Sequence, residues 1–376
     1  MKKNTLGIFG LLVAIFAVTA LLNDKFISAY NMQNLIKWSS LYAVMSIGVA
    51  FVIITGGIDL SIGSVVGLVA VVLAYMMKVK GINPATAIIT TLCLSALIGL
   101  VHGLLITKAK IQPFVVTLCG LLIYRSLSRW LTDNQSLGPV PLEDDKGYAN
   151  LDFIHQLDFI FSGKIAIGSF NLPTPFLFLL VIGIAAALFL NRTIWGRYLF
   201  ALGNNEEGAR YSGINTDNMK IIAYVICSLM AGIAGLLFAF ELDSVQPAQT
   251  GEFYELYAIA AAVLGGCSLR GGEGAISGIV IGAAVMQVLR NSITLIDRIP
   301  DNVEYAVIGA AILLGVGERD QLVGSSSHKR SSPGSWVTAT RGPTPRAGSK
   351  RRTPSGFPLQ GSSRRAFKAG AGRILP

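Results

Sequence analysis

Long uncharged runs of mostly apolar residues follow one another along the first 317 residues of the chain. Six of them come close to the length of about 20 residues that an α-helix needs to cross the hydrocarbon core of a bilayer. Each of the six therefore predicts one membrane-spanning helix. The six runs are residues 4–23, 38–58, 60–77, 81–107, 165–190 and 221–240.

Four further apolar runs are shorter. They are residues 111–124, 256–269, 274–289 and 305–317. A run of this length fits a half-helix or a re-entrant segment as well as a full span, but the density of the runs favours most of them crossing. The fold class predicted is all-α, a polytopic transmembrane helical bundle of about ten spans, six clear and four shorter.

The composition excludes a soluble globular protein. Hydrophobic residues make up 52% of the chain and charged residues only 14%, with a mean hydropathy of +0.58. Soluble domains average about 25% charged residues, so this chain could not cover a compact globule with solvated side chains. Its 41 dispersed glycines suit closely packed membrane helices.

The N-terminus resembles a secretion signal, since Lys2 and Lys3 precede an apolar run. That run is longer than the usual signal core of about 7–15 residues, which favours an uncleaved first span. Lysines beside a first span also place the N-terminus in the cytoplasm.

Lysines and arginines in the other loops extend this orientation, because they are retained on the cytoplasmic side. Counting ten spans places the basic turn at 108–110 and the basic loop 191–220 inside, and the acidic connection 131–172 outside. The turn at 78–80 disagrees, because its two lysines would lie outside.

The net charge of +10 belongs to the C-terminal tail alone. Residues 318–376 hold twelve of the 31 Lys and Arg residues and two of the 21 acidic ones, which leaves residues 1–317 neutral. From Gly324 onward the tail is rich in Ser, Gly, Pro and basic residues, a composition that predicts disorder. We divide the chain into a transmembrane domain, 1–317, and a basic tail, 318–376. We expect a non-functional extension and no nucleic-acid partner; an arm for nucleic acid or anionic lipid is the alternative.

No pattern in the chain predicts an enzyme. H-E-x-x-H, G-x-S-x-G and the Walker A pattern are all absent, so no ATP-binding loop of the P-loop type is expected. The four cysteines lie far apart in apolar stretches and predict packing residues, with no metal or redox centre. We therefore expect no catalytic, cofactor-binding or metal-ligating residue in this chain.

Asp59 is the sole charged residue between Trp38 and Met77. An ionisable residue at membrane depth is costly, which makes it a candidate for function. The neighbours Gly56, Gly57 and Ser61 complete a candidate for the transport path, because paired glycines loosen a helix. The alternative is a cytoplasmic turn in which Asp59 caps the following helix.

Two further features have structural interpretations. The Gly-rich stretch 265–274 joins two apolar runs and predicts a tight turn that permits close helix approach. His102, in an apolar run, is interpreted as a core histidine bonded to a backbone carbonyl; a proton relay is the alternative.

The pattern of residues 204–212, in the predicted cytoplasmic loop, predicts one short helix. Asn204 can serve as N-cap, with Glu207 completing a capping-box-like pair. Glu206 and Glu207 suit the positive helix start, and Gly213 can end the helix in the left-handed conformation. Such a helix can dock into a partner or be an ordinary surface helix, and the pattern alone leaves both open.

At these residues the sequence resembles the permease subunits of sugar ABC importers. They form the ribose-type branch of a family that also includes branched-chain amino acid permeases. The resemblance covers about residues 31–317, nearly everything before the tail. Its landmarks are residues 55–64, 196–198, 201–204, 212–214, 246–247, 255–256 and 258–261.

Importer permeases carry an E-A-A-x-x-x-G signature in the helix that contacts the ATPase. Here the matching frame is Glu207, Gly208, Ala209 and Gly213, with Gly208 in place of the middle alanine. That replacement costs up to about 1 kcal/mol of helix propensity. The resemblance implies that the ATPase-coupling residues are Asn204, Glu206, Glu207, Ala209 and Gly213. The family usually shows an acidic residue where this chain has Tyr257.

The resemblance also implies the partners. They are a second permease subunit, a cytoplasmic ABC ATPase that carries the ATP and Mg²⁺, and an extracytoplasmic sugar-binding protein, assembled in the bacterial inner membrane. The spans carry hydroxyl and amide groups but almost no fixed charge, which suits a neutral monosaccharide. Ribose is the first hypothesis; galactose, xylose, another polyol and a quorum-signalling furanose are alternatives.

Two other classes of function are compatible with a helical membrane protein. An ion-coupled secondary transporter needs carboxylates within its spans, and only Asp59 offers itself. A non-transporting membrane scaffold would insert stably without affecting uptake.

Overall fold

A computed structural model describes residues 3–140, 150–168, 170–242 and 244–296, together with residues 306, 309 and 310. Only those last three residues of the predicted span 305–317 are described, and the predicted disordered tail lies outside the described residues. The division of the chain at residue 317 therefore stays a prediction.

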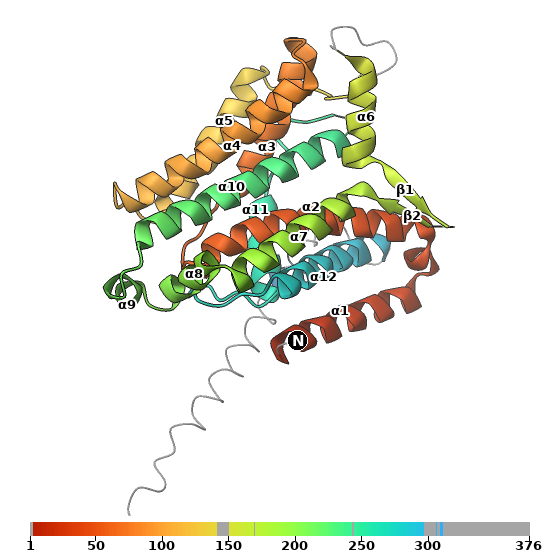
Figure 1. The fold of residues 1–376 in the computed structure, drawn as a ribbon. Helices are drawn as coiled ribbons and strands as arrows, with labels where there is room; N and C mark the ends of the chain where they lie inside the picture. The colour runs from red at the N-terminus through yellow and green to blue at the C-terminus, as the bar shows by residue number, and fades with distance from the viewer. Residues whose placement is uncertain are drawn as a thin grey trace, which may run out of the picture. The chain divides into compact units, whose positions relative to one another are not determined.

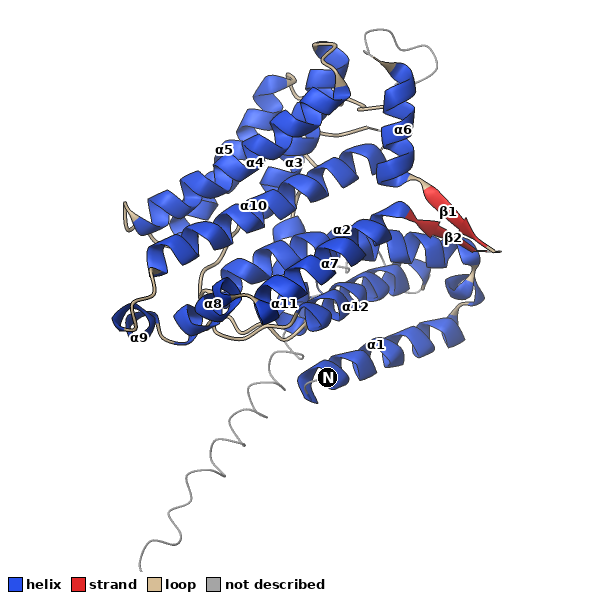
Figure 2. Cartoon of the chain, in the orientation of Figure 1, coloured by secondary structure: helices blue, strands red, loops and turns tan. Residues whose placement is uncertain are grey.

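Helices dominate the described residues (Figures 1 and 2). Two short helical segments, η1 (Asp24–Ile27) and η2 (Tyr75–Val79), follow α1 and α3. The other helices are α1 (Lys3–Leu22), α2 (Ala29–Ile54), α3 (Ile62–Ala74), α4 (Pro84–Thr107), α5 (Pro113–Leu131), α6 (Leu151–Ser162), α7 (Thr174–Arg192), α8 (Ile194–Asn204), α9 (Glu206–Tyr211), α10 (Thr216–Glu241), α11 (Tyr254–Leu264) and α12 (Ile276–Leu295).

Eight helices among the described residues are long and apolar enough to cross a membrane. They include a helix for each of the six clear runs, and the shorter runs 111–124 and 274–289 also become full-length helices, α5 and α12. The run 256–269 becomes only the short helix α11. The predicted polytopic helical bundle is confirmed.

The run 165–190 does not begin as a helix. Its first residues form a two-stranded antiparallel hairpin of β1 (Lys164–Ile167) and β2 (Phe170–Pro173), drawn in red in Figure 2. Gly168 takes the left-handed conformation at the turn, with φ of 63°. Pro173 and Pro175 then set the point at which α7 can begin, because proline is tolerated in a helix only at its first turn.

The inner part of the bundle is built on α2 and α10. Helix α10 packs against α4, α2 and α3, and α2 also packs against α12, α11 and α7. Small residues permit these approaches: a Cβ atom on Gly99 of α4 would lie 2.5 Å from the carbonyl oxygen of Tyr224 on α10, and one on Gly103 would lie 2.7 Å from the Cα of Ile221. Helix α1 packs mainly on α12 and exposes most of its apolar side chains, as a lipid-facing helix does.

Loops far apart in the sequence gather at the same ends of the bundle. Lys108, after α4, forms an ion pair of 2.9 Å with Asp217 at the start of α10, so the two basic loops predicted to be cytoplasmic lie together. Figure 1 shows α9 and α6 at opposite ends of α10. Helix α6, which belongs to the acidic connection, therefore lies opposite α9, in agreement with the predicted alternation.

Candidate functional site

Helix α9 is shorter than predicted and has a different cap. Asn204 is the last residue of α8, and Asn205 is the N-cap of α9, because its Oδ1 accepts a hydrogen bond of 2.9 Å from the backbone N–H of Gly208. The prediction that Asn204 caps one helix over 204–212 is wrong. Asn204 instead donates from Nδ2 to the carbonyl oxygens of Phe200 and Gly272.

The end of α9 agrees with the sequence. Gly213 has φ of 84°, the left-handed conformation that glycine adopts without strain. Its N–H donates to the carbonyl of Arg210 at 3.0 Å, and the N–H of Ile214 donates to the carbonyl of Ala209 at 3.1 Å. These two bonds satisfy carbonyls that the helix end would otherwise leave unpaired. The predicted role of Gly213 in ending the helix is confirmed.

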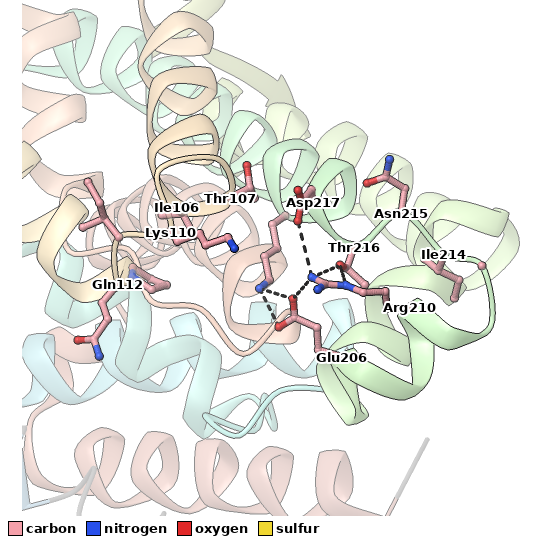
Figure 3. Close-up of a pocket in the computed structure, with 14 residues that line it drawn as sticks. Ile106, Thr107, Lys110, Gln112, Glu206, Arg210, Ile214, Asn215, Thr216 and Asp217 are labelled. Atoms are coloured by element: carbon pink, nitrogen blue, oxygen red, sulfur yellow. Dashed lines mark hydrogen bonds and ion pairs between the residues drawn. The ribbon is translucent and has the colours of Figure 1, made fainter.

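A group of ion pairs fixes α9 to the bundle (Figure 3). Both carboxylate oxygens of Glu206 lie within 2.8 Å of the Lys220 Nζ on α10. Arg210 lies 3.4 Å from Glu206 and 3.9 Å from Asp217, and Asp217 also pairs with Lys108. Glu206 therefore attaches the first turn of α9 to α10, and its side chain is directed toward the bundle.

The opposite side of α9 faces outward. Ala209 is buried against the bundle, whereas Glu207 is exposed and Tyr211 is 90% exposed. Residues 207 and 211 are four apart and share one helical face. Sequence reasoning selected Glu207 but missed Tyr211; the signal was an aromatic residue on an otherwise polar loop helix, a residue type enriched at protein interfaces.

Beside this helix opens a hollow of about 870 Å³. Its walls are the end of α4, the turn into α5, α9 and the first residues of α10. Lys110, Arg210 and Lys220 line it together with Glu206 and Asp217 (Figure 3). The concave wall and the projecting α9 together form a surface able to receive an element of another protein.

The second candidate region is the connection between α2 and α3, residues 55–61, called the break below. Asp59 is 1% exposed, and its Oδ1 accepts hydrogen bonds from the backbone N–H of Ser61 at 2.8 Å and from its hydroxyl at 2.7 Å. The thiol of Cys227 on α10 approaches the Oδ2 at 3.5 Å. Asp59 thus braces the start of α3, where Ser61 is the N-cap. The alternative, a turn in which Asp59 caps the following helix, agrees with this contact at the start of α3, although α10 covers the carboxylate.

Glycines allow the break to pack tightly. Gly56 has φ of 78°, and a Cβ atom on Gly57 would lie 2.8 Å from the Tyr224 hydroxyl, which donates to the carbonyl of Ile58. The Gly-rich turn after α11 lies next to it, with the N–H of Gly272 donating to the carbonyl of Ile54. The predicted tight turn at 265–274 is confirmed. The structure brings Gly56, Gly57, Asp59 and Ser61 together in one packed break; whether they line a transport path stays a prediction.

His102 has a different partner from the one predicted. Its Nε2 lies 2.9 Å from the hydroxyl of Tyr124 on α5, and the ring is buried. The prediction of a backbone carbonyl is wrong, because the close packing of α5 on α4 supplies a side chain. Within the described ranges, no group of three or more His, Cys, Asp or Glu side chains is placed to hold a metal ion.

Comparison with known proteins decides the family. Residues 31–316 match the family described as branched-chain amino acid transport system / permease component. The chain belongs to this permease family. The matched region contains all the candidate residues described above and ends just before the basic tail.

This permease has curated relatives that match over most of their length. It is 36% identical over 306 residues to the ribose import permease protein of Escherichia coli (strain K12), covering 81% of this chain and 90% of the relative. It is 34% identical over 311 residues to the ribose import permease protein of Bacillus subtilis (strain 168), covering 83% and 90%. It is 31% identical over 364 residues to the xylose transport system permease protein of E. coli (strain K12), covering 84% and 92%.

Proposed function

We propose that this chain is the transmembrane permease subunit of an ATP-binding-cassette importer that moves a neutral monosaccharide into the cytoplasm. The observation that carries the proposal is the similarity to ribose and xylose permeases over about nine-tenths of their length. The complex contains a second permease subunit, a cytoplasmic ATPase and an extracytoplasmic sugar-binding protein, and lies in the bacterial inner membrane. ATP and Mg²⁺ are bound and used by the partner ATPase.

In this proposal α9 is the coupling helix. The ATPase contacts the outward face of α9 at Glu207 and Tyr211, while Ala209 packs inward. The ion pairs of Glu206 with Lys220 and of Lys108 with Asp217 transmit a displacement of α9 to α10 and α4. Coupling between distant sites needs such a contiguous set of packed elements with alternative arrangements.

From α10 the displacement reaches the break between α2 and α3. Helix α10 packs against both helices and contacts the break through Tyr224 and Cys227. The connection between α2 and α3 is non-helical and partly buried, and such backbone in a membrane protein is tolerated where protein encloses it or where it lines a water-filled path. Asp59 supports the path in this account by fixing the start of α3, and it contacts the substrate only if the break opens.

Ribose is the proposed substrate, and xylose is the second. Both sugars are named in the relatives that match this chain, and both are neutral, as a path with few fixed charges requires.

An ion-coupled secondary transporter is the second candidate function, favoured by the burial of Asp59 within the bundle. The two candidates differ in their source of energy. A secondary transporter stops when the proton or sodium gradient is removed, whereas an ATP-driven importer continues.

Reconstituted vesicles test the proposal. The permease is inserted with its ATPase, ATP is supplied on the ATPase side, and the sugar-binding protein is added on the other side with radiolabelled ribose. We expect ATP-dependent accumulation that persists when an ionophore collapses the ion gradients. Uptake that ceases with the ionophore while ATP remains would assign the chain to the second candidate.

A further inference from the structure

A non-helical segment enters the bundle directly before α11. Residues 244–253 contain no α-helix or strand, and the segment is attached at one end by an isolated bridge between Val245 and Leu137. Non-helical backbone within a membrane protein is tolerated where it is buried in protein or lines a water-filled path. The contacts of this segment show where it lies.

Arg125 of α5 holds the segment in place. Its guanidinium donates to the carbonyl oxygens of Thr250 at 2.8 Å, Gly251 at 2.9 Å and Ala248 at 3.3 Å. The other side of the segment lies against α3, where a Cβ atom on Gly67 would be 2.4 Å from the Thr250 carbonyl oxygen. The segment is therefore clamped between α5 and α3.

Glu255, in the first turn of α11, lies at the inner end of this segment. It is 7% exposed, and a Cβ atom on Gly63 of α3 would lie 2.2 Å from its Oε2. Gly63 is two residues after Ser61, so Glu255 adjoins the break that Asp59 braces. The carboxylate is thus enclosed by the same elements that form the candidate transport path.

The Oε2 of Glu255 has no hydrogen-bond partner in the part of the chain that the structure describes. The guanidinium of Arg125 donates to backbone carbonyls, and among the described residues it forms no ion pair with Glu255. An ionised carboxylate accepts hydrogen bonds only, and leaving one of its oxygens without a donor inside a protein is costly. A buried acceptor without a donor is a position at which a ligand hydroxyl would complete the hydrogen bonding.

We propose that Glu255 is a substrate-contacting residue that accepts hydrogen bonds from sugar hydroxyls as the sugar passes the inner end of the clamped segment. This inference rests on the proposed function, since it names the group that meets the neutral sugar. Arg125 is a positioning residue that holds the backbone before Glu255. The contact forms when the segment and α3 separate, because in the arrangement described here Gly63 lies against the carboxylate.

Glu255→Gln tests the contact, with Glu252→Gln as the matched control on the same segment, because Glu252 is exposed. Both variants keep the side-chain size and remove the charge. In vesicles with the ATPase and the binding protein, we expect Glu255→Gln to lower the ribose moved per ATP hydrolysed by about tenfold, because the amide keeps an acceptor oxygen but its hydrogen bonds are weaker than those to a charged carboxylate. We expect Glu252→Gln to leave the ratio unchanged. An unchanged ratio in Glu255→Gln, or an equal fall of hydrolysis and uptake, would overturn the proposal.

Thiol labelling gives a second measurement that does not depend on uptake. A Glu255→Cys variant is treated with a membrane-impermeant thiol reagent during ATP turnover, with the wild-type chain as control for its four native cysteines. We expect labelling at position 255 and about tenfold slower labelling in excess ribose. Labelling that ribose does not slow would contradict the contact. If the wild-type complex itself moves neither ribose nor xylose, the proposed function fails, and that result is separate from either outcome for Glu255.

Discussion

The break at Asp59 and the helix α9 use the same kinds of residue for opposite purposes. Both contain acidic side chains, a local cap and a glycine with positive φ. At the break the carboxylate is buried and bonded to its own turn, whereas α9 buries only its base and leaves Glu207 and Tyr211 outside. Burial decides whether a polar motif braces the interior or presents a surface to a partner.

The largest expected effect is at Asp59. Asp59→Ala leaves the N–H and hydroxyl of Ser61 buried without their acceptor, which costs about 1–3 kcal/mol for each unsatisfied group. Asp59→Asn keeps an oxygen acceptor and should retain most of the stability while reducing uptake. Thermal unfolding of the purified permease and uptake in vesicles are the measurements. Wild-type transport by Asp59→Asn would leave Asp59 as a brace with no part in the path.

A smaller loss of stability is expected at Gly213. Gly213→Val forces a β-branched residue into the left-handed region, at a cost of about 1–2 kcal/mol or more, although no atom lies within 4 Å of the new Cβ position. The strain is relieved by changing the direction in which the chain leaves α9. We therefore expect the permease to remain in the membrane and to lose ATPase in co-purification. Retention of the ATPase with normal stimulation would place the coupling contact elsewhere.

Lys220→Met should separate coupling from stability. The ion pair of Lys220 with Glu206 is partly exposed, so its loss should change the free energy of unfolding by about 0.5 kcal/mol or less. Because this pair joins α9 to α10, we expect ATP hydrolysis to continue while sugar uptake falls. Equal, wild-type rates of hydrolysis and uptake would show that the pair transmits nothing.

The smallest effect on stability is expected on the outer face of α9. Glu207→Ala and Tyr211→Ala remove exposed side chains, so the unfolding temperature should change little. Each should weaken binding of the ATPase, and the loss should be larger for Tyr211 because aromatic residues dominate interface energies. Titration of the ATPase against vesicles that contain each variant measures the two losses.

Apolar run lengths predicted the eight described helices that are long enough to cross a membrane, because each span must satisfy its own backbone in lipid. Run lengths predicted the first and last residues of the helices poorly. Lys37 bounded one predicted span, yet α2 begins at Ala29 and continues through Lys37, which forms an ion pair with Glu241, the last residue of α10. A charge with a partner in the bundle can lie inside a helix, and a single sequence cannot show that partner.

Within the candidate sites, the sequence indicated local backbone features better than it indicated contacts between side chains. Gly213 followed from its position after a short polar helix, since local backbone geometry determines it. The cap at Asn205 could not be chosen over Asn204 because two consecutive asparagines offer the same chemistry. The burial of Asp59, the Tyr124 partner of His102 and the enclosure of Glu255 depend on the packing of helices distant in sequence.

Crosslinking tests the central claim, that the ATPase docks on α9, most directly. Tyr211→Cys and Ile167→Cys place a thiol at two exposed positions, one on α9 and one on the hairpin, which lies at the other end of the bundle (Figure 1). With a thiol-to-amine crosslinker and the assembled complex, the account predicts a permease–ATPase product from position 211 and none from position 167. A product from position 167, or none from position 211, would contradict it.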